Sequence, residues 1–250
     1  MTFLIIFSKK DDFTFFCLEI VTKNKKHIIW ALAALLLIGF SACKTNGDDM
    51  DVPNYENGSK YYPLDSGIVR IYQVDSIAFN DNSGTIDTFR FMLQEEIAGN
   101  INGQFLEPHV VIKRSIKKEL TDIWEPRASL FVLRTPNNLQ VVEENNRYVK
   151  LVFPLGNTNT WNGNMFNNLG RRSYLLQFKE KTFNNGDTSY SDCAQIQEAN
   201  IKNAIEEVFV RSVYAANVGL VNYTNIYLNT QTSGTSGYAI RQKIIFFYKP

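Results

Sequence analysis

The sequence has few of the residues that build metal sites, disulfide frameworks or nucleic-acid interfaces. Its 250 residues include two His and three Cys, too few for a His-rich zinc site or a disulfide framework. The 26 Lys and Arg nearly balance the 25 Asp and Glu, so no cationic excess is present to bind phosphate. These counts predict no metal, no cofactor and no nucleic-acid partner.

The common catalytic motifs are also missing. The sequence has no Gly-x-Ser-x-Gly, no Gly-x-Gly-x-x-Gly, no phosphate-binding loop and no His-Glu-x-x-His. His109 is the single histidine left if the N-terminal segment is removed. As a general base it would need a nucleophile and an orienting acid close to it in space, so a structural role is favoured. We therefore predict no catalytic residue and no enzymatic activity.

One apolar run near the N-terminus is short for a membrane-spanning helix. It has thirteen apolar or small residues from Ile28 to Phe40, whereas a spanning helix needs about 20. A basic segment, Lys23 to His27, precedes it, and the small residues Ser41 and Ala42 follow. This order is typical of a secretory signal, which we predict over residues 21–42.

The end of this segment resembles the lipobox of bacterial lipoproteins. In that motif, signal peptidase II cuts before a cysteine that carries diacylglycerol, and Phe40-Ser41-Ala42-Cys43 matches it with Phe40 where Leu is more usual. The resemblance implies cleavage between Ala42 and Cys43 and lipidation of the Cys43 thiol. The alternative is an ordinary secretory signal with an incidental cysteine. Cleavage would leave 208 residues, with 21 Lys and Arg against 22 Asp and Glu.

The segments before and after the signal are predicted to lie outside the β domain. Residues 1–20 hold a second apolar patch split by charges, which indicates a start site placed too early, with Val21 as the true first residue. If residues 1–20 are translated, a two-helix membrane anchor is the alternative. Residues 43–60 are rich in Asn, Asp and Gly and are predicted to be a flexible tether.

The first residues of this tether bear on the cellular location of the protein. Lys44 is soon followed by acidic residues, which resembles the surface-export signal of Bacteroidetes lipoproteins, although a merely soluble spacer is the alternative. We expect a protein anchored in the outer membrane by lipid, at the cell surface or, second, at the periplasmic face.

Residues 61–250 are predicted to form one β domain. In residues 86–98, Phe89, Phe91 and Leu93 share one face of the chain, and polar residues share the other. Such alternation is typical of a half-buried antiparallel strand. Similar runs predict further strands at residues 68–79, 104–117, 129–134, 147–153, 173–179, 208–214, 218–229 and 238–248.

Turn signals separate these runs and limit the fold class. Residues rich in Asn, Asp and Gly at 80–84, 99–103, 184–187 and 233–237 fit hairpins. The apolar residues of segment 191–209 are spaced between the periods of a helix and of a strand, so a helix and a strand are both open interpretations there. We predict a mainly β fold: a single curved antiparallel sheet, half-barrel or sandwich-like, with at most one or two short helices.

Two short motifs in this domain resemble uncharacterised Bacteroidetes lipoproteins. Residues 61–72 match an opening Tyr-x-Pro-Leu-x-x-Gly-x-x-Trp-x-Tyr pattern, with Arg70 at the aromatic position. Residues 214–221 match a closing Tyr-Ala-x-x-Val-Gly-Leu-Val pattern. The resemblance implies a curved antiparallel sheet, like the half-barrels of periplasmic lipoprotein carriers, and no known activity. Gly67 and Gly219 stand before strands, where close turns are needed.

The candidate ligand contacts are apolar side chains of the predicted strands. Phe89, Phe91, Leu93 and Ile244 would line an apolar groove in a half-barrel that holds a lipid-like or other apolar ligand. The alternative is a fully packed interior. Ser76, in Asp75-Ser76-Ile77, resembles the short O-glycosylation motif of Bacteroidetes export proteins.

Three aromatic residues lie in or beside polar loops. Trp124 falls in residues 121–127, and Trp161 and Phe166 fall in residues 157–170. Such rings either stack on a sugar or peptide or fold back over the core.

These observations predict a lipid-anchored cell-envelope lipoprotein with a non-catalytic binding or scaffolding role. Its partners would be the membrane, through the lipid on Cys43, and an envelope protein or an apolar ligand. One alternative is a carbohydrate-active or hydrolytic surface lipoprotein with a site near the Trp161 loop. The other is an accessory subunit of an envelope complex, docked through a strand edge or an aromatic patch.

Overall fold

The computed structural model describes residues 56–101 and 109–250. Contacts divide the chain into Met1–Val52 and Pro53–Pro250, and all described residues belong to the second unit. The predicted signal segment, the cleavage site and Cys43 lie outside the described residues. Among those that are described, no helix has the length and apolar character needed to cross a membrane.

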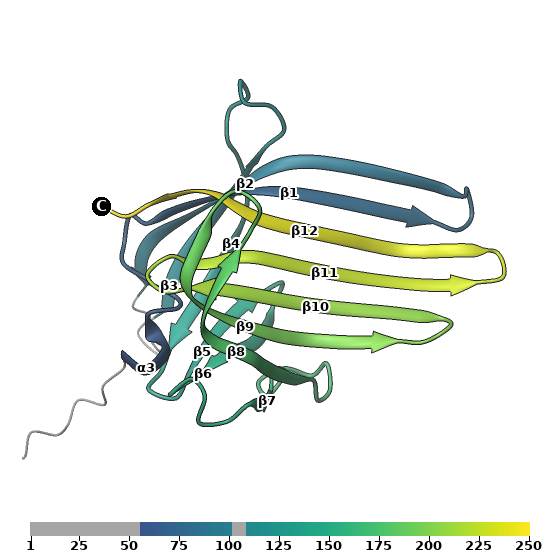
Figure 1. The fold of residues 1–250 in the computed structure, drawn as a ribbon. Coiled ribbons are helices and arrows are strands. Elements are labelled where there is room, and N and C mark those ends of the chain that lie inside the picture. Colours follow the sequence, from purple (N-terminus) through teal and green to yellow (C-terminus); the bar gives the residue numbers. More distant parts are fainter. Residues whose placement is uncertain (1–55, 102–108) are drawn as a thin grey trace, which may run out of the picture. The chain divides into compact units, whose positions relative to one another are not determined.

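The second unit is almost entirely β-structure (Figure 1). One helical turn precedes twelve strands along the described chain. Their bounds are α3 (Glu56–Ser59), β1 (Val69–Asn80), β2 (Thr85–Ile101), β3 (His109–Lys117), β4 (Glu125–Arg134), β5 (Asn138–Glu143), β6 (Asn146–Val152), β7 (Thr160–Asn162), β8 (Ser173–Asn184), β9 (Ser189–Lys202), β10 (Glu206–Ala215), β11 (Gly219–Gln231) and β12 (Gly234–Tyr248).

The strands form a single antiparallel sheet made of two meanders. Its order is β6-β5-β4-β3-β2-β1-β12-β11-β10-β9-β8-β7, so each meander has six strands that follow one another in sequence. The meanders join at the centre of the sheet, where β1 pairs with β12 along nearly its full length. The mainly β fold class and the single antiparallel sheet are confirmed.

The sheet curves until its two outermost strands meet. The Val149 amide of β6 donates to the Gly163 carbonyl, just after β7, at 2.8 Å. Trp161 Nε1 donates to the Val149 carbonyl at 2.9 Å, and Asn167 Nδ2 donates to the Arg147 carbonyl at 2.9 Å. Only a strongly curved sheet can bring its opposite edges within hydrogen-bond distance, so the predicted curvature is confirmed.

Most strands follow the alternation of the sequence. In β1, Arg70, Tyr72 and Val74 are buried and their neighbours are partly exposed. The helix left open over residues 191–209 does not form, because this segment is β9 and the start of β10. The pairing of β9 with β10 skips Glu198, and a bulge of this kind shifts the alternation by one residue. The mixed spacing of the apolar residues comes from that bulge.

The two sequence motifs pack against each other through Arg70. Its guanidinium donates from Nε to the Val218 carbonyl at 2.6 Å and from Nη2 to the Pro63 carbonyl at 2.7 Å. The Tyr62 and Tyr214 rings lie 6.0 Å apart beside it. Arg70 stands where the opening motif usually has an aromatic residue. It therefore connects the opening motif, residues 61–72, to the closing motif, residues 214–221.

The main hydrophobic core lies inside the curve of the sheet. It joins side chains from both meanders, including Ile97, Ile112, Leu151 and Ile196, all of which are almost fully buried. A smaller cluster includes Cys193 and Val213 and is covered by side chains of the β8–β9 hairpin, Phe178, Phe183 and Tyr190.

The β8–β9 hairpin runs across the sheet to β12 (Figure 1). At its tip, Asp187 pairs with Lys243 at 2.6 Å, and Asn185 Nδ2 donates to the Ile244 carbonyl at 3.2 Å. These contacts explain how the hairpin can cover the smaller cluster although β8 and β12 are not neighbours in the sheet.

Candidate binding surface

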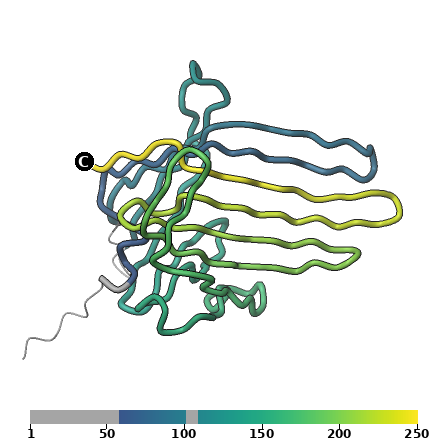
Figure 2. Tube along the Cα trace, viewed as in Figure 1, coloured from purple at the N-terminus to yellow at the C-terminus, as the bar shows by residue number. Residues whose placement is uncertain are grey.

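Six neighbouring strands extend beyond the rest of the sheet (Figures 1 and 2). β3 pairs with β2 only from Met92 onward, and β8 pairs with β9 only as far as Gln197. Past these points β2, β1, β12, β11, β10 and β9 continue as three long hairpins that remain paired with one another. We call this part of the sheet, residues 75–90, 199–211 and 224–241, the arm.

One face of the arm presents aromatic and aliphatic side chains. The register places Tyr238 opposite Tyr227 and Tyr227 opposite Val208, and Phe89 lies in the adjacent row of the same face. Phe89, Tyr227, Tyr238 and Ile201 are 58%, 43%, 39% and 47% exposed. The Tyr227 and Tyr238 rings stack with centroids 6.1 Å apart. We call this surface the aromatic face; it consists of Phe89, Ile201, Val208, Val210, Tyr227, Tyr238 and Ile240.

The opposite face of the arm is mixed. Near the base it carries charges, with Arg90 paired to Asp75 at 2.6 Å. Further out it carries the apolar side chains of Ile77, Phe79, Ile86, Phe209, Ile226 and Leu228, together with Thr88 and the Lys202–Glu207 ion pair. Of these apolar residues Ile86 alone is largely exposed, whereas four large apolar residues are exposed on the aromatic face, and such a cluster is typical of an interaction site.

A buried ion pair lies inside the curve of the sheet. Lys150 Nζ is 2.7 Å from Glu198 Oε2, and the two side chains are 17% and 4% exposed. Ser212 Oγ also donates to Glu198. Strand pairing skips both Lys150, between β5 and β6, and Glu198, between β9 and β10. Two bulges thus turn the two charged side chains toward each other from separate meanders.

The electrostatics of this pair favour the charged forms. Burial would raise the pKa of Glu198, but Lys150 and the hydrogen bonds from Lys150, Ser212 and Tyr174 outweigh it and hold the pKa below its usual range. Burial would lower the pKa of Lys150, but Glu198 raises it well above the usual value. Lys150 and Glu198 are therefore a structural ion pair whose charges neutralise each other, and neither is poised to accept or donate a proton near neutral pH.

A second buried carboxylate, Glu95 of β2, is also neutralised by a cation. Arg114 Nη2 of β3 lies 2.8 Å from Glu95 Oε1, and the same guanidinium pairs with Glu143 of β5. Tyr72 donates its hydroxyl to Glu95 at 3.3 Å. Burial would lower the pKa of Arg114, but the two carboxylates raise it overall. Glu95 is thus part of the folded core.

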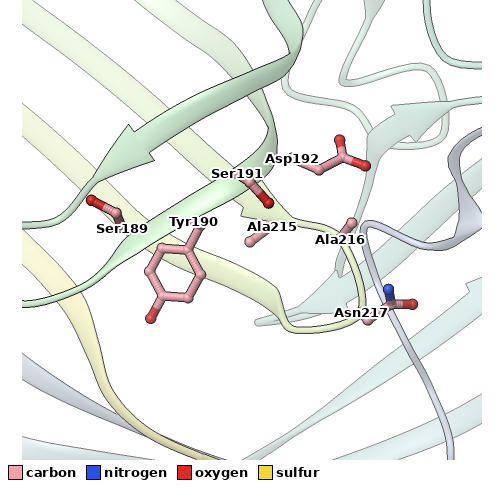
Figure 3. Close-up of a pocket in the computed structure, with 7 residues that line it drawn as sticks. All are labelled: Ser189, Tyr190, Ser191, Asp192, Ala215, Ala216 and Asn217. Carbon is pink, nitrogen blue, oxygen red and sulfur yellow. The ribbon is translucent and has the colours of Figure 1, made fainter.

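A pocket of about 320 Å³ lies between the start of β9 and the turn from β10 to β11 (Figure 3). Its lining residues are Ser189, Tyr190, Ser191, Asp192, Ala215, Ala216 and Asn217. The Asp192 carboxylate accepts from Lys60 at 2.7 Å and from the Tyr61 hydroxyl at 2.6 Å. Burial would raise the pKa of Asp192, but these two hydrogen bonds lower it. Both carboxylate oxygens are used to hold the start of the domain, which leaves the pocket without a free acid.

The cysteine beside this pocket is not activated. Cys193 is fully buried, and burial raises the pKa of its thiol to about 11. A thiol with such a pKa stays protonated at neutral pH and is a poor nucleophile. In residues 56–101 and 109–250, no group of three or more His, Cys, Asp or Glu side chains could hold a metal ion.

The predicted groove residues share one face of the sheet but differ in exposure. Phe91 lies opposite Val74, and both Leu93 and Ile244 lie opposite Tyr72. Ile244 is 2% exposed and belongs to the smaller cluster, against which Phe91 and Leu93 pack. Phe89 alone of the four reaches the exposed part of the aromatic face.

The loop aromatics are found in three different environments. Trp161 lies on β7, is 8% exposed and packs edge-on against Tyr174. Phe166 is 46% exposed. Trp124 is half-buried, with Lys117 Nζ 4.8 Å from its ring centroid. The structure does not bring these three side chains together at one site.

Ser76 lies on β1 opposite Phe89 and Ile240, partly exposed within the aromatic face. A glycan on Ser76 would therefore cover that face.

Sequence reasoning did not single out Tyr227 and Tyr238 as a pair, nor Lys150 and Glu198. Each residue falls in a predicted strand or in the segment left open. The Tyr227–Tyr238 pair follows from the hairpin of β11 and β12, whose turn was predicted but whose register was not. The Lys150–Glu198 pair joins strands of separate meanders, which no local pattern connects. One local signal was present: each charged residue interrupts the alternation of apolar and polar residues in its strand. Such an interruption indicates a bulge that turns the charged side chain inward.

No protein-family model matches the sequence, and a search of curated proteins found no match. A search of solved structures found a protein of Parabacteroides distasonis that has been provisionally described as a lipoprotein. The two chains are 9% identical and superpose with a TM-score of 0.42, over 75% of this chain and 98% of the other. A likeness of this degree supports no inference about this chain.

Proposed function

We propose that the protein is a lipid-anchored component of the cell envelope that binds a partner through the aromatic face of its arm, without catalysis. The anchor rests on the lipobox-like sequence that ends in Cys43. The binding role rests on one observation: large apolar residues of four different strands are 39–58% exposed on one face of the arm. A scaffolding role as an accessory subunit uses the same surface.

Two features favour binding over hydrolysis. The buried carboxylates Glu95 and Glu198 hold cations within the core, where a substrate has no access. Trp161 is the aromatic residue around which a sugar site would form, and its ring is buried with its Nε1 bonded to the Val149 carbonyl. We therefore do not retain a carbohydrate-active or hydrolytic site near Trp161.

The anchor is tested with Cys43→Ser in the full chain. We expect the variant to lose the acyl mass and to move from the membrane fraction to the soluble fraction, because the thiol is where the lipid attaches. Mass spectrometry of the native N-terminus and membrane fractionation measure this. Unchanged membrane attachment together with no acyl mass on the unaltered protein would rule the anchor out.

The binding surface is tested by photo-cross-linking in cells. We expect p-benzoylphenylalanine at position 227 or 238 to give a discrete adduct, because both rings lie in the aromatic face. The matched control is position 241, which is exposed on the same strand as Tyr238 but on the opposite face. Adducts of equal yield from positions 238 and 241, or none from either, would exclude a partner on this face.

A further inference from the structure

The outer edge of β2 is left without a neighbouring strand along the arm. β2 pairs with β1 continuously from Thr85 to Glu96, but β3 begins to pair with it only at Met92. Among the described residues, Thr85–Phe91 therefore has no strand on its outer side. Backbone N–H and C=O groups on such an edge are free to pair with another chain.

This edge carries two charges, Asp87 and Arg90, but lacks three other features that commonly protect exposed strands, namely Lys, Pro and a bulge. Residues 85–91 contain no Lys and no Pro, and their pairing with β1 shows no bulge. Its cation, Arg90, is held by Asp75, and Ile86 and Phe89 are 64% and 58% exposed. Edges of soluble proteins are usually protected by Lys, Pro or a bulge, so this edge is suited to accept a strand.

The other edge of the arm differs in having a bulge and a Lys. It belongs to β9, which carries the Glu198 bulge and ends in Lys202. Arg172 Nε also donates to the Glu198 carbonyl at 3.2 Å. The contrast singles out β2 as the edge that can pair.

We propose that Thr85–Phe91 pairs antiparallel with the same segment of a second copy of this chain, about a twofold axis at Thr88. Thr88 is the middle of these seven residues, so a twofold axis there pairs every residue of the segment with a residue of the second copy. Asp87 then faces Phe89 of the second copy, Ile86 faces its Arg90 and Thr85 faces its Phe91. No like charges lie opposite each other, and a Thr–Thr pair at the centre is favourable.

Neighbouring registers are worse. A twofold axis at Asp87 or at Arg90 places two like charges opposite each other, which is destabilising. An axis at Phe89 pairs Thr85 and Ile86 with positions beyond Phe91, where β3 already occupies the edge. The charges of the segment and the length of its free edge thus select Thr88 as the position of the twofold axis.

The pairing joins two arms into one sheet. Because the axis is normal to the sheet, the aromatic faces of both copies lie on the same side. Seven residues span about 23 Å, which buries less than the roughly 1,200 Å² of a standard interface, so we expect weak association in dilute solution. Confinement of both copies to one membrane would raise their effective concentration and favour the pair.

The test is disulfide cross-linking of full-length Thr88→Cys in isolated membranes. Residues directly opposite in an antiparallel pair have Cα atoms about 4.5–5.5 Å apart, which suits a disulfide. We expect a disulfide-linked dimer on mild oxidation, seen by non-reducing electrophoresis. Native Cys193 does not compete, because it is fully buried.

The matched control is Asp87→Cys, one residue away on the same edge. In the proposed register the two copies of residue 87 are about 8 Å apart, beyond disulfide reach, so we expect little dimer. An Asp87→Cys chain mixed with a Phe89→Cys chain is expected to cross-link. Equal dimer from Thr88→Cys and Asp87→Cys, or none from Thr88→Cys, would overturn the proposal.

A charge test uses Ile86, which is exposed and should not affect folding. In the Thr88→Cys background, Ile86→Lys places a cation opposite Arg90 of the second copy, whereas Ile86→Glu places an anion there. We expect Ile86→Lys to slow dimer formation about threefold or more and Ile86→Glu to preserve or increase it. The same effect of both substitutions would contradict this pairing. The aromatic face reaches this edge through Phe89, but positions 227 and 238 lie on other strands, so their photo-cross-linking reports on the partner of the face separately from this pairing.

Discussion

Glu198→Gln is expected to cost about 3–5 kcal/mol of the free energy of unfolding, because it leaves the Lys150 ammonium buried without its counter-ion. The pair joins β6 of one meander to β9 of the other at 2.7 Å, with both side chains largely out of water. Its loss therefore affects the contact that helps to hold the curved sheet closed. Chemical denaturation of the two proteins measures the difference.

The matched control is an exposed ion pair in the same meander. Lys202 and Glu207 lie 3.0 Å apart, with side chains 72% and 34% exposed. Glu207→Gln should cost no more than about 1 kcal/mol, since surface pairs contribute little. Replacing both buried partners, Lys150→Met with Glu198→Leu, should cost less than Glu198→Gln alone. A Glu198→Gln protein no weaker than the Glu207→Gln protein would show that the buried pair contributes nothing.

The same pair makes stability depend on pH in a defined direction. The pKa of Glu198 is lowered in the folded protein, so its contribution is present above the usual carboxyl pKa and is lost as pH falls through the lowered value. The pKa of Lys150 is raised, so its contribution is lost only as pH rises through that raised value. The difference between Glu198→Gln and the unaltered protein should therefore shrink in strong acid and stay constant around neutral pH.

Local patterns predicted the strands, and with them the fold class. Alternation in residues 86–98 depends only on which side chains face the core, and it placed Phe89, Phe91 and Leu93 on one face as observed. The short strands β5 and β7 were not predicted, because β7 has three residues and β5 buries three consecutive residues, so neither shows an alternation. Strand β9 was left open, because the bulge at Glu198 breaks its alternation.

The candidate site could not be read from local patterns. The aromatic face extends from Tyr238 to Phe89 only because β1 lies beside β12, and the free edge of β2 requires knowing where β3 begins to pair. The ion pair of Lys150 with Glu198 joins residues 48 positions apart through two bulges. Each depends on strand pairing, which is set by the packing of the whole domain and not by the spacing of neighbouring residues.

Arg70→Ala is expected to be similarly damaging, with a loss of about 3 kcal/mol or more in the free energy of unfolding. Arg70 is 1% exposed, and its guanidinium donates to the carbonyls of Val218 and Pro63. Its removal leaves two acceptors unpaired, at about 1–3 kcal/mol each, and a cavity beside Tyr62. Arg70 is, with the Tyr62–Tyr214 ring pair, one of the contacts between the two sequence motifs.

Arg90→Ala is the matched control, since Arg90 lies on the same sheet but its side chain is 72% exposed. It should change stability by about 1 kcal/mol at most. Arg70→Lys separates charge from geometry: it keeps a cation but cannot reach both carbonyls with a planar fork, so it should recover only part of the loss. Full recovery by Lys would mean that charge alone matters at position 70. If Arg70→Ala were as stable as Arg90→Ala, the two motifs would be held together by their apolar contacts, such as Tyr62 with Tyr214, and not by the guanidinium.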